Sequence, residues 1–198
     1  MSGTLVRMRL PAAERRAQLL ESATKVFADA GFHNASMNDV AEHAGVTKPV
    51  LYQHFTSKRD LYKELLNEIG SGLRDAIAKA VAQATSPREQ IQFGFRTYFG
   101  FVATQPDAYR VLFGAGTRRD EEFAAEARRV EASIAEVVAE HIAIEGLSHE
   151  RRLLLANGIV GVAEGACRFW LANEVEVDAT VLADEVSQLA WAGLRGVR

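Results

Sequence analysis

The chain has 198 residues, a formal net charge of −3, and 48% hydrophobic and 25% charged residues. These proportions are ordinary for a soluble globular protein and exclude a chain that is disordered over most of its length. No apolar run approaches the ~18 residues that span a bilayer, and the N-terminus lacks the apolar segment of a secretory signal. We therefore expect a cytoplasmic protein with no membrane partner.

The charge is distributed unevenly along the chain. Residues 1–63 carry 9 Lys and Arg against 6 Asp and Glu, a balance of +3, while the remainder has a balance of −6. A basic end is the electrostatic signature of a nucleic-acid partner. Within it, Arg7 and Arg9 precede the first long helix, and they form either a mobile arm on DNA phosphates or a merely disordered basic tail.

Apolar residues recur at three- and four-residue spacing and nowhere alternate over a strand's length, so the pattern predicts an all-α protein. The first long helix is expected over about residues 12–30, and Gly31 ends it.

Two short helices joined by a tight turn are predicted in residues 36–58. Ser36 and Asp39 form a reciprocal capping signal at the start of the first helix. That helix should end near Ala44. Gly45 then occupies a position with positive φ, which a residue without Cβ adopts without strain.

The second short helix begins after Thr47, and Pro49 falls in its first turn, where no intrahelical hydrogen bond is lost. The inward-facing residues of the pair are small or apolar: Val40, Ala41, Ala44, Val46, Val50 and Leu51. This arrangement predicts a helix-turn-helix that enters the major groove of DNA. An ordinary corner of two helices with a solvated polar face is the alternative.

The outer face of the second short helix carries hydrogen-bonding groups and an aromatic ring, which suit phosphates and base edges. The expected DNA-binding residues are Ser36, Thr47, Lys48, Pro49, Val50, Tyr52, Gln53, His54 and Lys58. Within this set, Lys48, Tyr52 and His54 are expected to touch DNA, with Thr47 and Lys58 holding phosphates.

The segments RRAQLLESATKVFADAGF (residues 15–32) and AGVTKPVLYQHFTSKRDLY (residues 44–62) resemble the DNA-binding domain of the TetR family of bacterial transcription regulators. The resemblance implies an all-helical protein with about nine helices in each subunit. Two subunits are expected to form a homodimer that binds a palindromic double-stranded DNA operator. The resemblance also implies a helix-turn-helix domain over residues 1–62. A helical domain over residues 63–198 is then expected to dimerise and to bind a small effector.

Cap signals and glycines divide the remainder into six further helices. They are expected over about residues 58–85, 87–103, 107–113, 121–145, 149–171 and 179–195. All four prolines fall at proposed helix starts, which supports these boundaries together.

The last two long helices are predicted to form the dimer interface, because small residues allow close helix approach. The expected interface residues are Gly158, Gly161, Gly165, Val186, Leu189, Ala190 and Gly193. The alternative is that these residues pack only the core of the monomer.

Aromatic residues and nearby arginines of the C-terminal part suggest an apolar effector site with room for an anionic group. The expected ligand-binding residues are Phe95, Tyr98, Phe99, Tyr109, Arg110, Phe113, Arg168 and Trp170. Plain core packing is the alternative for each of them. The lone cysteine, Cys167, lies among them in an apolar stretch, and a packed thiol is favoured over a redox sensor.

Three C-terminal segments carry a second resemblance. AYRVLFGAG (residues 108–116), ACRFWLANE (residues 166–174) and QLAWAGLRGV (residues 188–197) are similar to actinobacterial regulators of fatty-acid synthesis within the TetR family. This resemblance implies a long-chain acyl-CoA as effector. The expected function is a repressor that this ligand releases from its operator.

Enzyme chemistry finds no support in the sequence, and we expect no catalytic residues, no metal site and no cofactor. The five histidines are scattered, no glycine-rich phosphate loop follows a strand, and no G-x-S-x-G nucleophile motif occurs. The rival from another class is a helical lipid-binding or interaction protein that does not bind DNA.

Overall fold

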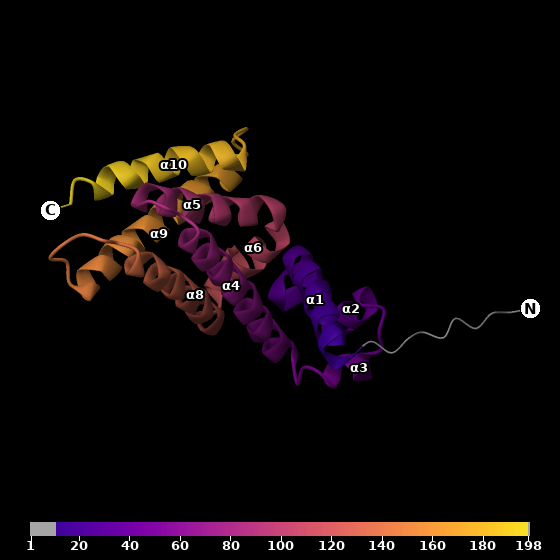
Figure 1. The fold of residues 1–198 in the computed structure, drawn as a ribbon. Helices are drawn as coiled ribbons and strands as arrows, with labels where there is room; N and C mark the ends of the chain where they lie inside the picture. The colour runs from indigo at the N-terminus through magenta and orange to yellow at the C-terminus, as the bar shows by residue number, and fades with distance from the viewer. Residues whose placement is uncertain (1–10, 198) are drawn as a thin grey trace, which may run out of the picture. The chain divides into compact units, whose positions relative to one another are not determined.

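The computed structural model describes residues 11–197, and this part of the chain consists of α-helices joined by short loops, without β-strands (Figure 1). The helices are α1 (Ala12–Asn34), α2 (Met37–His43), α3 (Lys48–Tyr52), α4 (Lys58–Ala82), α5 (Pro87–Thr104), α6 (Pro106–Phe113), α7 (Ala115–Arg119), α8 (Glu121–Glu140), α9 (His149–Ala172) and α10 (Ala179–Leu194). The all-α prediction is confirmed. None of the helices in this range is long and apolar enough to cross a membrane. Arg7 and Arg9 lie outside the described residues.

The chain divides into two compact units, of which one ends at Leu65 and the other begins at Leu66, inside α4. The functional division that we expect, with residues 1–62 for DNA and residues 63–198 for effector and partner, stays a prediction.

The first unit packs α2, α3 and the start of α4 around α1. Its fully buried side chains include Leu19, Val40, Leu51, Phe55 and Leu61. At the end of α1 an aromatic cluster forms, in which the Tyr62 ring lies 5.0 Å from the ring centres of both Phe27 and Phe32. The backbone of Gly31 has a φ of 73°, so the regular helix stops where the sequence predicts and a single further turn follows it.

In the second unit, α10 packs along α5 and α8 packs along α9. Phe99, Leu112 and Phe123 are fully buried in its core. Gly70 of α4 allows a close helix approach, because a Cβ built there would lie 2.2 Å from a methyl carbon of Val130 on α8. An ion pair also joins two helices here: the Arg96 guanidinium of α5 donates to both carboxylate oxygens of Asp184 on α10, at 2.7 and 2.8 Å.

Two elements differ from the sequence expectation. The long helix expected to reach residue 145 ends at Glu140, because Ile142 and Leu147 turn back into the core and bury against Ala135 and Ala156. The second difference is α7, a short helix in the segment where glycines predicted a break. Thr117 holds it in place by donating its hydroxyl hydrogen to the Val111 carbonyl at 2.5 Å.

Candidate nucleic-acid interface and effector cavity

Local hydrogen bonds fix the start of α2, and a glycine turns the chain between α2 and α3. The Ser36 hydroxyl accepts a hydrogen bond from the Asp39 N–H at 3.2 Å, and the Ser36 N–H donates to the Asp39 carboxylate at 2.8 Å. Gly45 has a φ of 64°, as the predicted turn requires. Ala41 and Leu51 are buried where the two helices meet. The side chain of Ser36 is therefore committed to the cap, although the residue itself stays exposed.

The outer face of α3 is polar and open. Thr47, Lys48, Pro49, Tyr52 and Gln53 are exposed, whereas Val50 and His54 are half-buried. Tyr52 exposes 45% of its surface although it is a large aromatic residue. The Lys48 ammonium lies 6.0 Å from the centre of the Tyr52 ring, within the range of a cation–π contact. The two side chains therefore form a cationic aromatic pair on the surface.

Lys58, at the start of α4, makes contacts within the first unit that the sequence did not predict. Its ammonium donates hydrogen bonds to the backbone carbonyls of Phe32 at 2.6 Å, Ala35 at 2.8 Å and His33 at 3.3 Å. It also lies 4.5 Å from the centre of the Phe32 ring. A lysine ammonium has three donors, and three carbonyls at the end of α1 take them here. Lys58 thus fastens α4 to the end of α1 in the chain without DNA, and the phosphate contact expected of it stays a prediction.

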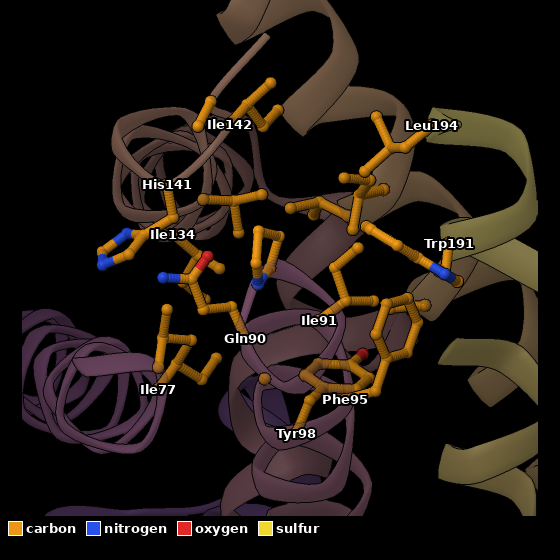
Figure 2. Close-up of a pocket in the computed structure, with 18 of the residues that line it drawn as sticks. Ile77, Gln90, Ile91, Phe95, Tyr98, Ile134, His141, Ile142, Trp191 and Leu194 are labelled. Atoms are coloured by element: carbon orange, nitrogen blue, oxygen red, sulfur yellow. The ribbon is translucent and has the colours of Figure 1, made fainter. Parts of the chain in front are cut away.

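A cavity of about 460 Å³ lies inside the second unit (Figure 2). Its walls are largely aliphatic and aromatic and come from α4, α5, α6, α8, α9, α10 and the loop after α8. Residues that line it include Ile77, Ile91, Phe95, Tyr98, Phe113, Glu131, Ile134, Val138, His141, Ile142, Val160, Glu164, Trp191, Leu194 and Arg195. A volume of this size is typical of a small-molecule site.

The cavity has one open end and one closed end. Pro87, Ala143, Glu145 and Arg195 are exposed and mark the opening. Residues that line the other end are buried, namely Phe95, Tyr98, Phe113 and Ala163. In Figure 2 the side chains of Phe95 and Tyr98 lie at the bottom of the view and Ile142 lies at the top. We call the buried end, around Tyr98, Glu131 and Glu164, the blind end of the cavity.

Of the expected ligand-binding residues, Phe95, Tyr98 and Phe113 line this cavity. Phe99, Tyr109, Arg110, Arg168 and Trp170 do not. Phe99 is fully buried, with the Trp170 ring edge-on at 6.2 Å between ring centres.

The remaining residues of that set have roles in local packing and pairing. Trp170 donates its indole N–H to the carbonyls of Val175 and Val177, at 3.1 and 3.2 Å, and so closes the end of α9. Arg168 pairs with Glu164 at 3.6 Å, and a contact of the same length joins Arg110 to Asp107.

Sequence reasoning missed the residues that α8, α10 and the loop after α8 contribute. Glu131 is the most informative of these. It falls on the same helical face as Ala127, Ile134 and Val138, which are spaced by three or four residues, so a carboxyl group in an apolar stripe was the available signal. Trp191 sits in a comparable stripe on α10.

The blind end holds polar groups without ordinary partners. The Tyr98 hydroxyl and the Oε1 atom of Glu164 are buried and have no hydrogen-bond partner. Burial, and then the neighbouring Glu164 carboxyl, raise the pKa of Glu131 to about 7. Burial also raises the pKa of Tyr98 well above its ordinary value, so this group stays a neutral phenol. Near neutral pH the Glu131 carboxyl therefore keeps its proton in a substantial fraction of the molecules.

The helices α9 and α10 carry a face of exposed apolar and small residues. Leu154 exposes 74% of its surface, Phe169 65% and Leu189 66%. Gly158, Gly161 and Gly165 lie between the first two on α9, and a Cβ at any of the three would meet no atom within 4 Å. The packing of this chain therefore does not require these glycines. We call the surface formed by Leu154, the three glycines, Phe169 and Leu189 the α9–α10 face.

The other expected interface residues divide between two environments. Gly193 is exposed on α10 with open space around it. Val186 and Ala190 are buried within this chain, exposing 8% and 9% of their surfaces. Those two residues pack the monomer, as the alternative interpretation of the sequence holds.

Comparison with known proteins assigns the family. A family model described as "Bacterial regulatory proteins, tetR family" matches residues 19–65, and one described as "Tetracyclin repressor-like, C-terminal domain" matches residues 87–193. The HTH-type transcriptional activator FasR of Mycolicibacterium smegmatis is 34% identical over 190 residues, which cover 96% of this chain and 87% of FasR. The chain belongs to the TetR family.

The fold comparison agrees. A TetR-like transcriptional regulator from Rhodococcus sp. RHA1 superposes with a TM-score of 0.76 at 31% identity, over 96% of this chain and all of that one. FadR from Bacillus subtilis, in complex with stearoyl-CoA, gives a TM-score of 0.77 at 18% identity, over 92% of this chain and 99% of that one. Membership of the TetR family makes the protein a helix-turn-helix regulator of transcription and not an enzyme.

Proposed function

We propose that the protein is a homodimeric repressor that binds a palindromic operator through α3 and leaves it when an apolar effector occupies the cavity. The observation that carries the DNA-binding part is the outer face of α3, where Lys48 and Tyr52 are exposed on a helix-turn-helix whose inner face is buried at Ala41 and Leu51. Thr47, Pro49 and Gln53 surround them. The exposed groups of α3 suit phosphates and base edges.

The α9–α10 face supports the homodimer. Large apolar side chains at Leu154, Phe169 and Leu189 face solvent in the isolated chain, and an exposed apolar patch of this kind marks a protein contact. Open glycines between them give a second copy room for close helix approach. In a two-fold dimer the two α3 helices would lie one helical turn of DNA apart, about 34–36 Å, or a multiple of that distance.

For the effector we propose a long-chain acyl-CoA, on the basis of the apolar cavity and the similarity of the C-terminal segments to fatty-acid-synthesis regulators. Each buried methylene contributes about 0.8 kcal/mol, so apolar contacts alone support tight binding. Arg195 lines the cavity and gives the charged end of such a ligand a cationic partner. FadR shares only the fold with this chain, and its stearoyl-CoA is a property of that protein.

The sign of regulation is proposed on the simplest mechanism, in which an occupied operator blocks the promoter. FasR is named as an activator, so a reporter gene behind the native promoter must decide. Deleting the regulator should raise reporter expression. Lower expression after deletion would assign activation instead.

The test of the function begins with DNA fragments of the source genome selected on the purified protein. Binding to the selected fragment should fall steeply with salt, because cationic side chains release counterions from phosphates. Tyr52→Ala should weaken it by about 1–3 kcal/mol without changing thermal stability. Acyl-CoAs of increasing chain length are then titrated against the labelled complex. The effector assignment fails when no chain length alters operator affinity, and the regulator assignment fails when no fragment is retained.

A further inference from the structure

The blind end of the cavity contrasts with the rest of its wall. The side chain of Tyr98 lines the cavity, only 7% of this residue is exposed, and its hydroxyl has no hydrogen-bond partner. The Cys167 thiol beside it is only a weak hydrogen-bonding group. Across the same end, the buried Oε1 atom of Glu164 is also unpartnered. Buried polar atoms are nearly always paired, so these two invite a ligand group that hydrogen-bonds.

The charge at this end limits what that group can be. Burial, and then the neighbouring Glu164 carboxyl, raise the pKa of Glu131 to about 7. A protonated Glu131 carboxyl can donate a hydrogen bond, and the unpartnered Oε1 atom of Glu164 can accept one. The remaining negative charge has a partner already, because Arg168 lies 3.6 Å from the Glu164 carboxylate, and Arg118 and Arg128 act on Glu131.

We propose that the blind end is a subsite for a hydroxyl group at the inner end of an otherwise apolar effector, with Tyr98, Glu131 and Glu164 as its hydrogen-bonding partners. A hydroxyl donates and accepts, as the site does. A carboxylate meets two carboxyl groups and is repelled, while an ammonium adds a cation where arginines already balance the charge. A methyl end leaves the buried polar atoms unpaired, so a chain that ends in a hydroxyl should bind more tightly than one that ends in methyl.

This inference rests on the proposed function only in taking the cavity as the effector site. It is tested without DNA and without coenzyme A, by titration calorimetry of the free protein with four probes of similar length. Dodecanol carries the hydroxyl, and undecyl methyl ether has the same number of heavy atoms without a donor. Dodecylamine and dodecanoate carry a cation and an anion.

We expect dodecanol to bind about tenfold tighter than the ether and tighter than either charged probe. Tyr98→Phe and Glu131→Met should each reduce the preference for dodecanol over the ether to about threefold or less. Glu136→Met is the matched control, because Glu136 is exposed on the same helix and does not line the cavity. It should keep the full preference.

Several results would overturn the inference. Equal affinity for alcohol and ether would mean that no polar subsite operates, and tighter binding of dodecylamine or dodecanoate would assign a charged one. A preference that persists in Tyr98→Phe would place the hydroxyl elsewhere, and this conservative variant decides the matter should Glu131→Met not fold. A protein that binds its operator and responds to acyl-CoA but shows no alcohol preference keeps its function and loses this subsite. A protein that shows the alcohol preference but neither binds DNA nor responds to acyl-CoA keeps this subsite and loses the proposed function.

Discussion

The first unit and the second unit place their functional groups in opposite ways. In the first, the residues that shape the site are close in sequence: Ser36 pairs with Asp39, and Gly45 turns the chain between α2 and α3. In the second, the cavity wall is collected from helices that lie far apart in the sequence, from Ile77 on α4 to Trp191 on α10. The outer face of α3 is therefore determined by local geometry, and the cavity is the space that remains unfilled after long-range packing.

The two sites also differ in how their polar groups are treated. On α3 the polar side chains are exposed to solvent, so a substitution there should change affinity for DNA and leave the fold unaltered. At the blind end of the cavity, Tyr98 and Glu164 keep polar atoms buried without partners. Substitutions there should act on ligand binding and stability together. Substitutions can therefore test the contrast between the exposed outer face of α3 and the buried cavity.

The largest effect is expected on the α9–α10 face, the proposed interface between two copies of the chain, because only a dimer presents two α3 helices to one operator. Leu189→Arg places a charge in the proposed interface and should convert the dimer to monomers. Operator affinity should then fall on the order of hundredfold or more, because binding through two linked sites is lost. Light scattering and operator titration measure the two effects. Ala132→Arg, at an exposed position of α8, is the control and should leave both unchanged. A full dimer with Leu189→Arg would remove this residue from the interface.

Two lysines of the first unit should separate DNA binding from stability. Lys58→Met removes the ammonium that three carbonyls share at the end of α1, and should lower the free energy of unfolding by about 1.5–3 kcal/mol. Lys48→Met should leave stability unchanged and weaken operator binding, with a salt dependence reduced by about one unit of slope. Denaturant titration and operator binding at several salt concentrations give both quantities. The assignment of Lys58 to α1 fails if its variant keeps full stability and loses the salt slope.

The sequence predicted the first unit well because its signals are local. The start of α2, the turn at Gly45 and the end of the regular part of α1 at Gly31 all follow from caps and glycine conformations that a few neighbouring residues determine. The contacts that Lys58 makes with the end of α1 are the exception. Its carbonyl partners lie 23 to 26 positions earlier in the chain, beyond the reach of any local pattern.

In the second unit the sequence predicted the helices better than the cavity. Phe95, Tyr98 and Phe113 were found because aromatic residues suggest an apolar site. Phe99 and Trp170 satisfy the same criterion and pack away from the cavity, since a ring that fills space and a ring that borders it look alike in sequence. The early end of α8 was equally hidden, because it depends on the burial of Ile142 and Leu147 against other helices.

Two glycines on α4 test how tightly the second unit is packed around its cavity. A Cβ at Gly70 would lie 2.2 Å from a Val130 methyl carbon, whereas a Cβ at Gly72 would meet nothing within 4 Å. Gly70→Ala should therefore destabilise the protein by about 1–3 kcal/mol through overpacking. Gly72→Ala should stabilise it by about 0.5–1 kcal/mol, because alanine favours the helix. Thermal melts of the two variants measure opposite shifts. Equal shifts would mean that α4 and α8 do not approach closely in solution.

The smallest effect expected is a pH dependence of stability that originates at the blind end. The pKa of Glu131 rises from 4.5 to about 7, mainly through burial and then through Glu164, while Arg118 and Arg128 act in the opposite direction. Because the folded state holds this proton more tightly than the unfolded state, the contribution of Glu131 to stability is fully present below pH ~4.5. It is lost as pH rises toward ~7. Glu131→Gln has no carboxyl group to titrate at this position. The free energy of unfolding of this variant, relative to that of the parent protein, should therefore rise between pH ~4.5 and ~7. Denaturant titrations at a series of pH values measure the difference between the two curves. Glu136→Gln, an exposed neighbour on α8, should follow the parent curve. Parallel curves for the parent and Glu131→Gln would show that this carboxyl group stays solvated and that its pKa is not raised in the folded protein.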